Sequence, residues 1–390
     1  MKYKILFPLL LLGFIGCKKS ELSLTPALEK KLCQPSYNSA KEYIDGYKVT
    51  TFIDTTVQKI AEGALIKALN DNQAEYGCIV LMETNTGKIK AMVNLNKDSD
   101  GAYKSKTTTA VSQTNEPGGL MRTFDLLALL EDKKEDTTSV FDTHGGKISF
   151  LGKQITDSHA VEGKVSLATA YKFSSNTVFA QAINDSYASN PELFCNRYKK
   201  MGLHKSLGIP FESEGLPTFP EPKTSQWSNI TLPWLSIGYG LTLTPVQILT
   251  FYNAIANNGV MVKPLFLSEI KDNGVNIKKY APEVLNSKIA SEKTISILQH
   301  LLTKKANGGG NTVLTSNNVK IAGTGATVQI DYADQTIIEK KYLASFVGYF
   351  PANKSKYSVV CFIYNPKIIE PLYSVIACGD VIKKIAENVK

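Results

Sequence analysis

The chain has 390 residues, of which 43% are hydrophobic and 20% are charged, a balance typical of a globular protein and not of a disordered one. The formal net charge is +9, and the lysines are spread along the chain instead of forming a basic stripe. Nucleic-acid binding is therefore not expected.

The first residues predict export to the cell envelope. Two lysines precede an apolar run, residues 5–16, which has the length of a signal peptide and is too short to cross a bilayer. The run ends in Phe14-Ile15-Gly16-Cys17, which resembles a lipobox. We expect residues 1–16 to be a lipoprotein signal peptide and Cys17 to carry the lipid that anchors the chain to a membrane, facing the periplasm. The alternative is a plain secretory signal and a soluble mature protein in the same compartment.

Residues 17–45 contain Lys, Ser, Glu and Pro with little periodicity, and they predict a flexible tether after the lipidated cysteine. No linker-like break follows, so residues 46–390 are expected to form one domain. The other five cysteines form no Cys-Xaa-Xaa-Cys pair and the four histidines are scattered singly. No metal site and no cofactor are expected.

Both ends of the domain carry strand patterns. After a helical pattern at residues 57–69, a buried strand is predicted at 77–82, a turn at 83–87 and a return strand at 89–93. A second strand pair is predicted at 342–350 and 357–364, and a last amphipathic helix at 375–389. The middle is mostly helical apart from a glycine-rich loop at 308–310. The fold class is therefore α+β, with an antiparallel sheet assembled from distant segments.

Several segments, taken in order, resemble the transpeptidase domain of class B, division-type penicillin-binding proteins. They are residues 85–92, 116–118, 174–176, 237–245, 253–259 and 344–351. The resemblance implies the penicillin-binding and serine β-lactamase-like fold, in which an antiparallel sheet packs with helices beside an all-helical subdomain.

The family's nucleophile motif is Ser-Xaa-Xaa-Lys, with the two side chains on one face of a helix. Here the matching residues are Gly119-Leu120-Met121-Arg122. Glycine offers no oxygen, and a guanidinium with a pKa above about 12 stays protonated near neutral pH. The resemblance therefore implies a degenerate site in which both catalytic side chains are lost.

The family's third motif, Lys-Thr-Gly, lies on an edge strand that receives the ligand. An alignment without a gap places Thr324-Gly325-Ala326 there, and a slip of one residue would place Gly323-Thr324-Gly325. The lysine is missing in both alignments. Thr324, Gly325 and the nearby Thr327 remain candidate substrate-binding residues.

Ser174 and Asn176 match the family's Ser-Xaa-Asn element and are the other candidate substrate-binding residues. Alternatively, their side chains could serve only as caps or in turns. For Arg122, a helix-surface position paired with Glu116 or Asp125 is favoured over a role as a substrate clamp.

Two functions follow from the resemblance. The favoured one is a catalytically inactive pseudoenzyme that binds or scaffolds in peptidoglycan synthesis or cell division, with peptidoglycan stem peptides and wall-synthesis or division proteins as its partners. The alternative is an active D,D-transpeptidase or carboxypeptidase with a non-standard nucleophile, for which Ser112, Thr123 and Thr327 are candidates. Such a nucleophile needs a base at about 3 Å, and no lysine or histidine stands out in the sequence nearby.

Overall fold

The computed structural model describes residues 24–307, 314–332, 336, 339–367 and 373–389. The predicted signal peptide, Cys17 and the glycine-rich loop at 308–310 lie outside these residues. Within the described ranges, no helix is both long and apolar enough to cross a membrane.

The core of the fold is a six-stranded antiparallel sheet in the order β14-β15-β16-β3-β4-β5. Its strands, from one edge to the other, are β14 (Ala322–Gln329), β15 (Tyr342–Phe350), β16 (Tyr357–Tyr364), β3 (Tyr76–Glu83), β4 (Ile89–Lys97) and β5 (Tyr103–Lys104). The strands predicted at both ends of the domain are thus confirmed, and they meet where β16 pairs with β3.

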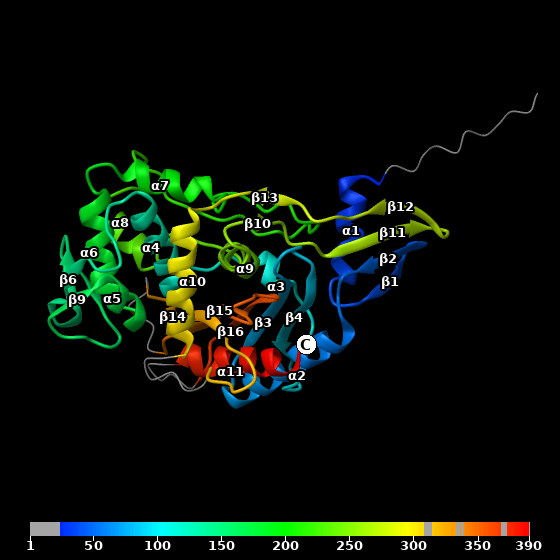
Figure 1. The fold of residues 1–390 in the computed structure, drawn as a ribbon. Coiled ribbons are helices and arrows are strands. Elements are labelled where there is room, and N and C mark those ends of the chain that lie inside the picture. Colours follow the sequence, from blue (N-terminus) through cyan, green and yellow to red (C-terminus); the bar gives the residue numbers. More distant parts are fainter. Residues whose placement is uncertain (1–23, 308–313, 333–335, 337–338, 368–372, 390) are drawn as a thin grey trace, which may run out of the picture.

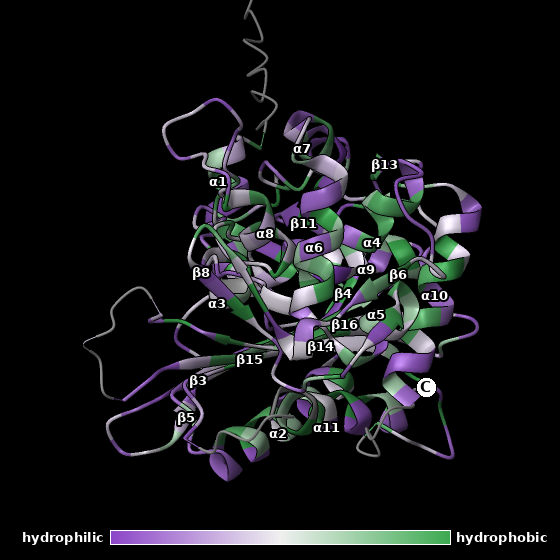
Figure 2. Cartoon of the chain, turned by 90° about the vertical axis from the view of Figure 1, so that its left-hand side faces the viewer, coloured by the Kyte–Doolittle hydropathy of each residue, from purple (hydrophilic) through white to green (hydrophobic). Residues whose placement is uncertain are grey.

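Side chains alternate between two buried faces of this sheet, because successive residues of a strand point in opposite directions. Ile79 and Leu81 face a layer made of α2 (Thr55–Asp71) and α11 (Tyr373–Asn388). Val80 and Met82 face the larger, mostly helical part of the chain. Figure 2 shows α2 and α11 below the sheet and the other helices above it. Both faces are covered, which explains why β16 is buried along its whole length and β3 is buried except at its two ends.

The helical part holds most of the middle of the chain. It is built from α4 (Arg122–Glu131), α5 (Leu167–Phe173), α6 (Asn176–Tyr187), α7 (Pro191–Lys200), α8 (Thr231–Ser236), α9 (Pro245–Ala256) and α10 (Glu292–Asn307). Helix α9 lies between this part and the sheet, and all of its residues are buried. It begins with a capping box in which the side chains of Thr244 and Gln247 each accept a hydrogen bond from the other's backbone N–H group.

The helical part also carries short elements. They are α3 (Thr109–Ser112), the 3-10 turns η1 (Gly118–Met121) and η2 (His144–Gly146), and the strand pairs β6 (Val140–Asp142) with β9 (Lys164–Ser166), β7 (Lys147–Phe150) with β8 (Lys153–Thr156), and β10 (Met261–Val262) with β13 (Val284–Asn286).

A second sheet corrects the tether prediction. Its order is β1-β2-β11-β12, from β1 (Lys41–Ile44), β2 (Tyr47–Thr51), β11 (Leu267–Asp272) and β12 (Val275–Lys279), and α1 (Pro26–Ser36) packs beside it (Figure 1). The prediction of a flexible tether is wrong for residues 26–45. Strand β2 pairs with β11, which lies more than two hundred residues away, and such a partner leaves no periodic signal in a five-residue strand.

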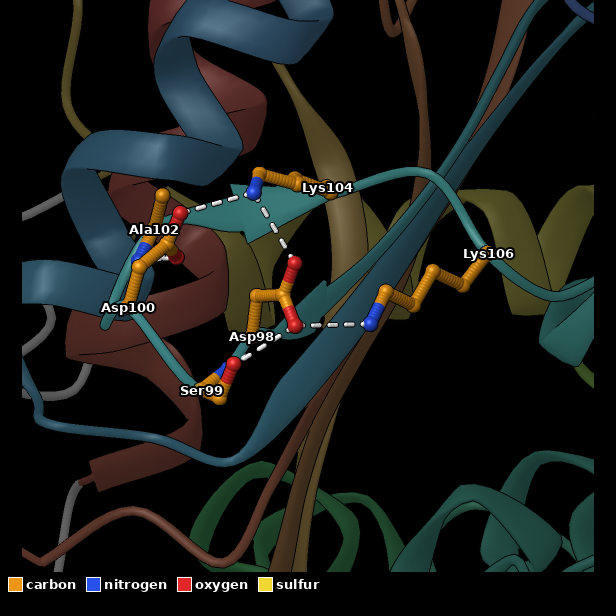
Figure 3. Close-up of polar contacts among 6 residues, drawn as sticks. All are labelled: Asp98, Ser99, Asp100, Ala102, Lys104 and Lys106. Atoms are coloured by element: carbon orange, nitrogen blue, oxygen red, sulfur yellow. Dashed lines mark hydrogen bonds and ion pairs between the residues drawn. The ribbon is translucent and has the colours of Figure 1, made fainter.

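The exposed edge at β5 is lined with charge. Asp98 accepts hydrogen bonds from Lys104 and Lys106, and Asp100 accepts from Lys104 and from the backbone N–H of Ala102 (Figure 3). The two lysines lower the pKa of Asp98 well below its usual value. These groups are exposed, so their energetic contribution is small, but charge on a short edge strand discourages pairing with a second chain.

We expect Leu32→Ala to test whether α1 belongs to the folded body. Leu32 is fully buried in the same hydrophobic cluster as α9, so its truncation should lower the free energy of unfolding by about 2–4 kcal/mol. Urea denaturation measures this change. The matched control is Lys31→Ala, which removes only an exposed pair with Asp45 and should cost about 0.5 kcal/mol or less. Equal, small effects of both substitutions would restore the tether interpretation.

Candidate functional site

A cavity of about 430 Å³ lies where the sheet edge meets the helical part. Its walls come from η1 and the start of α4, the α5–α6 junction, the end of α10, and β14, which runs along one side. Figure 1 shows α10 descending beside the helical part to end near β14. The cavity is lined by all the site residues predicted from the sequence: Gly119, Arg122, Ser174, Asn176, Thr324, Gly325 and Thr327.

The backbone of η1 is held at the cavity by a close approach of two glycines. The N–H of Gly118 donates to the carbonyl of Gly238 at 3.1 Å. A Cβ atom on Gly238 would lie 2.0 Å from the carbonyl oxygen of Gly118, and φ at Gly238 is +79°. Only glycine fits this position, which explains the glycine in the segment Ile237-Gly238-Tyr239-Gly240.

Arg122 is buried and not on the helix surface. Its side chain is 7% exposed, its Nη1 donates to the carbonyl of Gly119 at 3.1 Å, and its Nη2 donates to Oδ1 of Asn176 at 2.5 Å. The predicted pairing with Glu116 or Asp125 is wrong. Glu116 accepts from the N–H of Gly240 and from the hydroxyl of Tyr332 instead. The helix turns inward here because α4 is buried through its first eight residues, which leaves no solvent-facing side at Arg122.

The guanidinium fills the space in front of Gly119. A Cβ atom on Gly119 would lie 2.0 Å from Nη1 of Arg122 and 2.7 Å from its Cζ. A serine at residue 119 therefore requires the guanidinium to leave its two hydrogen-bond acceptors. The two departures from the family motif are thus sterically linked, because the arginine occupies the volume that the serine side chain would need.

Two buried carboxyl groups, those of Asp157 and Asp125, act electrostatically on Arg122 but do not line the cavity. Asp157 accepts from the hydroxyl of Ser175 at 2.8 Å and from the N–H of Thr177 at 2.9 Å. Asp125 is fully buried and both of its oxygens lack a hydrogen-bond partner among the described residues. Burial raises the pKa of Asp125 well above its usual value and the charge of Arg122 opposes this shift only in part, which favours the neutral acid.

The α5–α6 junction shows where the side chains of Ser174 and Asn176 lie. Ser175, and not Ser174, caps α6, because its hydroxyl accepts from the N–H of Val178. Ser174 is left-handed with φ of 61°, and its hydroxyl contacts a lysine in the cavity. Asn176 accepts from Arg122 and donates to the carbonyl of Thr156 at 2.8 Å. Both side chains therefore take part in the cavity network.

That lysine, Lys305 on α10, is the residue that sequence reasoning missed. Its Nζ donates to Oγ of Ser174 and to the carbonyl of Tyr171, each at 2.7 Å, and lies 4.6 Å from the centre of the Tyr171 ring. A signal existed in the sequence: residue 305 continues the helical spacing of the buried Leu298 and Leu302, so it falls on the apolar face of α10. Among the described residues, Lys305 has hydrogen bonds to none of the three hydroxyls expected as replacement nucleophiles, and its hydroxyl partner, Ser174, was not one of them.

Lys305 lies in an unfavourable place for a charge. Its pKa is well below the usual value, first because burial penalises the ammonium and second because Arg122 is nearby. Among the described residues, no aspartate or glutamate lines this cavity. Within the described ranges, no group of three His, Cys, Asp or Glu side chains is placed to hold a metal ion.

The three hydroxyls proposed as replacement nucleophiles are not equally placed. Ser112 donates to the carbonyl of Thr108 and borders a different pocket. Thr123 is fully buried between the hydroxyls of Tyr171 and Tyr252. Thr327 lines the cavity from β14 and is exposed. Of the three, only Thr327 is accessible from the cavity, and its hydroxyl has no hydrogen bond to a lysine or histidine among the described residues.

Solved structures share this architecture. A peptidoglycan glycosyltransferase from Burkholderia ambifaria has a TM-score of 0.71 and 22% identity, covering 87% of this chain and 96% of that one. The TP domain of penicillin-binding protein 3 from Burkholderia pseudomallei has a TM-score of 0.71 and 20% identity, covering 86% of this chain and 93% of that domain. The fold is therefore that of penicillin-binding-protein transpeptidase domains, as the sequence predicted.

The model of the penicillin binding protein transpeptidase domain matches residues 77–387, so the chain belongs to this family. A similar curated relative is peptidoglycan D,D-transpeptidase FtsI of Escherichia coli K12, 27% identical over 326 residues, which are 81% of this chain and 51% of the relative. The relative of that name in Buchnera aphidicola is also 27% identical, over 86% of this chain and 57% of its own length. The chain thus spans about half the length of these relatives.

We expect the steric link between residues 119 and 122 to appear as a coupling energy. Gly119→Ala should lower the free energy of unfolding by about 1–3 kcal/mol, because the new methyl group meets the guanidinium. In an Arg122→Ala background the same change should cost little, since the space is then free. Urea denaturation of the four proteins of this double-mutant cycle measures the coupling. Equal costs in both backgrounds would mean that the guanidinium does not occupy this space in solution.

Proposed function

We propose that this protein is a catalytically inactive member of the transpeptidase family that binds peptides of the cell wall in its cavity, and that it has a binding or scaffolding role in peptidoglycan synthesis or cell division. The observation that carries the proposal is the guanidinium of Arg122 in front of Gly119. Acyl transfer by the family's route needs a hydroxyl at this point, and a cation held by two hydrogen bonds stands there instead.

The cavity itself supports a binding role. It retains a volume of about 430 Å³, and the side chains of Ser174, Asn176 and Thr324 still face it. The hydroxyl of Thr324 is buried and has no hydrogen-bond partner among the described residues. A buried polar group without a hydrogen-bond partner lowers the free energy of unfolding, so an apolar residue in place of Thr324 would stabilise the fold. The presence of this hydroxyl in the cavity therefore supports a binding role.

A second candidate function is acyl transfer by Ser174. Its Oγ lies 2.7 Å from Nζ of Lys305, and burial favours the neutral amine that can accept a proton. In such a step Oγ would attack the carbonyl carbon of a peptide or β-lactam while its proton passed to Nζ. The C–N bond would then break, and the same proton would pass to the leaving nitrogen. This pair was not among the replacement nucleophiles expected from the sequence.

Fluorescent penicillin separates the two candidates. We expect no covalent label on the purified protein after denaturing electrophoresis, because Gly119 has no oxygen to acylate. A class B penicillin-binding protein with an intact motif, labelled in parallel, is the positive control. A label that disappears in Ser174→Ala would establish the second candidate, and a label that survives this substitution would show a different nucleophile. Either label would refute the pseudoenzyme.

We also propose that the protein is an envelope lipoprotein anchored through Cys17 and facing the periplasm, with wall-synthesis or division proteins among its partners. The support is the lipobox-like sequence before Cys17. When the full chain is expressed in a bacterial host, radioactive palmitate should label it and Cys17→Ala should abolish the label. Cys33→Ala is the control that should stay labelled. An unlabelled wild-type chain in the soluble periplasmic fraction would favour the plain secretory signal.

A further inference from the structure

A second hollow lies between α5 and α10, outside the candidate site. Its volume is about 550 Å³, and it is bordered by residues of both helices and by Lys320, which precedes β14. Among the described residues, Lys172 is the only one that lines both this hollow and the site cavity. We call this hollow the α5–α10 groove, and it is a separate feature from the candidate site.

The floor of the α5–α10 groove is apolar. Ala168 and Leu301 line it and are half-buried, and Tyr171 lines it and is buried. Leu301 packs against the main hydrophobic core but is only partly covered by it. Apolar surface that is open to water gains free energy when a partner covers it. The floor therefore favours an occupant that carries a large apolar side chain.

Three exposed lysines line the same groove: Lys172 of α5, Lys304 of α10, and Lys320. Among the described residues, no aspartate or glutamate lines the groove, and none of these three lysines forms an ion pair. Lysines elsewhere in the chain do lie beside carboxylates, as Lys104 does beside Asp98. Positive charge that gathers at one groove without a counter-charge attracts anions, so the groove favours an acidic occupant.

The position of the groove favours a protein over a membrane lipid as the occupant. With Cys17 lipidated as proposed, the eight residues 18–25 join the anchor to the start of α1 at Pro26, and they can span at most about 28 Å. The anchor therefore holds α1 close to the membrane. Figure 1 shows α5 and α10 at the left of the molecule and α1 at the right, so the groove lies away from the anchored end.

We propose that the α5–α10 groove is a docking site for an acidic segment of a partner protein. The segment places a large apolar side chain against Ala168 and Leu301, and it places carboxylates beside Lys172, Lys304 and Lys320. Exposed ion pairs contribute little one by one, so the apolar side chain supplies the anchor, and the lysines supply orientation and selectivity. The proposal rests on the scaffolding role proposed above, and it names the surface and the chemistry of the partner.

The test is a selection of random peptides displayed on phage, of about twelve residues and so long enough for three helical turns, on the immobilised full chain. The groove variant changes its three lysines together: Lys172→Gln, Lys304→Gln and Lys320→Gln. The control variant changes three exposed lysines that form no ion pair among the described residues: Lys59→Gln, Lys97→Gln and Lys153→Gln. Both variants lose the same charge, so nonspecific attraction to acidic peptides is weakened equally in the two.

We expect the selected peptides to be acidic and to contain at least one large apolar residue. By fluorescence anisotropy, the most enriched peptide should bind the wild-type chain and the control variant alike. It should bind the groove variant at least about tenfold more weakly, because three favourable charge contacts are lost. Replacing its acidic residues by their amides, or its large apolar residue by alanine, should each weaken binding to the wild-type chain by about tenfold. Added salt should weaken it too.

A photoreactive derivative of the same peptide locates the site on the wild-type chain. We expect it to crosslink to α5 or α10, and this result decides the location even where the groove variant fails to fold. Crosslinks confined to other elements would overturn the proposal. All the substituted lysines are exposed, so both variants should keep the melting temperature of the wild-type chain.

The other outcomes are equally decisive. Enrichment of neutral or basic peptides, equal binding by the groove and control variants, or no enrichment at all would overturn the docking site. Should vesicles of phosphatidylglycerol bind the wild-type chain and not the groove variant, while no peptide is enriched, the occupant would be a lipid and the proposal would be wrong. Penicillin labelling of the chain would refute the pseudoenzyme and leave peptide docking unaffected, so the failure of this inference and that of the proposed function are distinguishable.

Discussion

The arrangement of residues in the candidate site depends on the buried guanidinium of Arg122. Arg122 is held between the carbonyl of Gly119 and the amide oxygen of Asn176, and among the described residues no ion pair joins it to a carboxylate. Burying a charge in this way is costly unless hydrogen bonds satisfy it, and here they do so only in part. A Cβ atom at residue 119 would meet the guanidinium, so a larger residue there requires Arg122 to move. The glycine at residue 119 and the position of the arginine side chain are therefore sterically linked.

The same constraint shapes the rest of the cavity. With Arg122 turned toward Asn176, Ser174 has no lysine on α4 to contact, and Lys305 reaches it from α10 instead. A serine and a lysine are therefore adjacent in this cavity, as they are in the family's Ser-Xaa-Xaa-Lys motif, but this lysine lies on α10 and not on α4. This pair is the basis of the second candidate function, acyl transfer through Ser174.

The strands at 342–350 and 357–364 and the helices at 57–69 and 375–389 could be predicted because their patterns are local. Apolar residues repeat with the period of the element, and the element buries the face that they define. The residues 26–45 could not be predicted in this way. Strand β2 is stable because β11 pairs with it, and Leu32 is buried because the body of the protein covers α1, and neither partner is visible in a short local window.

The sequence, through the family resemblance, predicted that Gly119 and Arg122 stand at the positions of the motif's serine and lysine, and it named seven candidate residues that line one cavity in the structure. Only the tertiary structure decided how these residues lie. It turned Arg122 inward, where a surface pair with Glu116 or Asp125 had been expected, and it placed Lys305 beside Ser174. The physical reason is that the burial of a side chain and its charged contacts depend on which helices pack together in the fold. The type of a residue does not determine that packing.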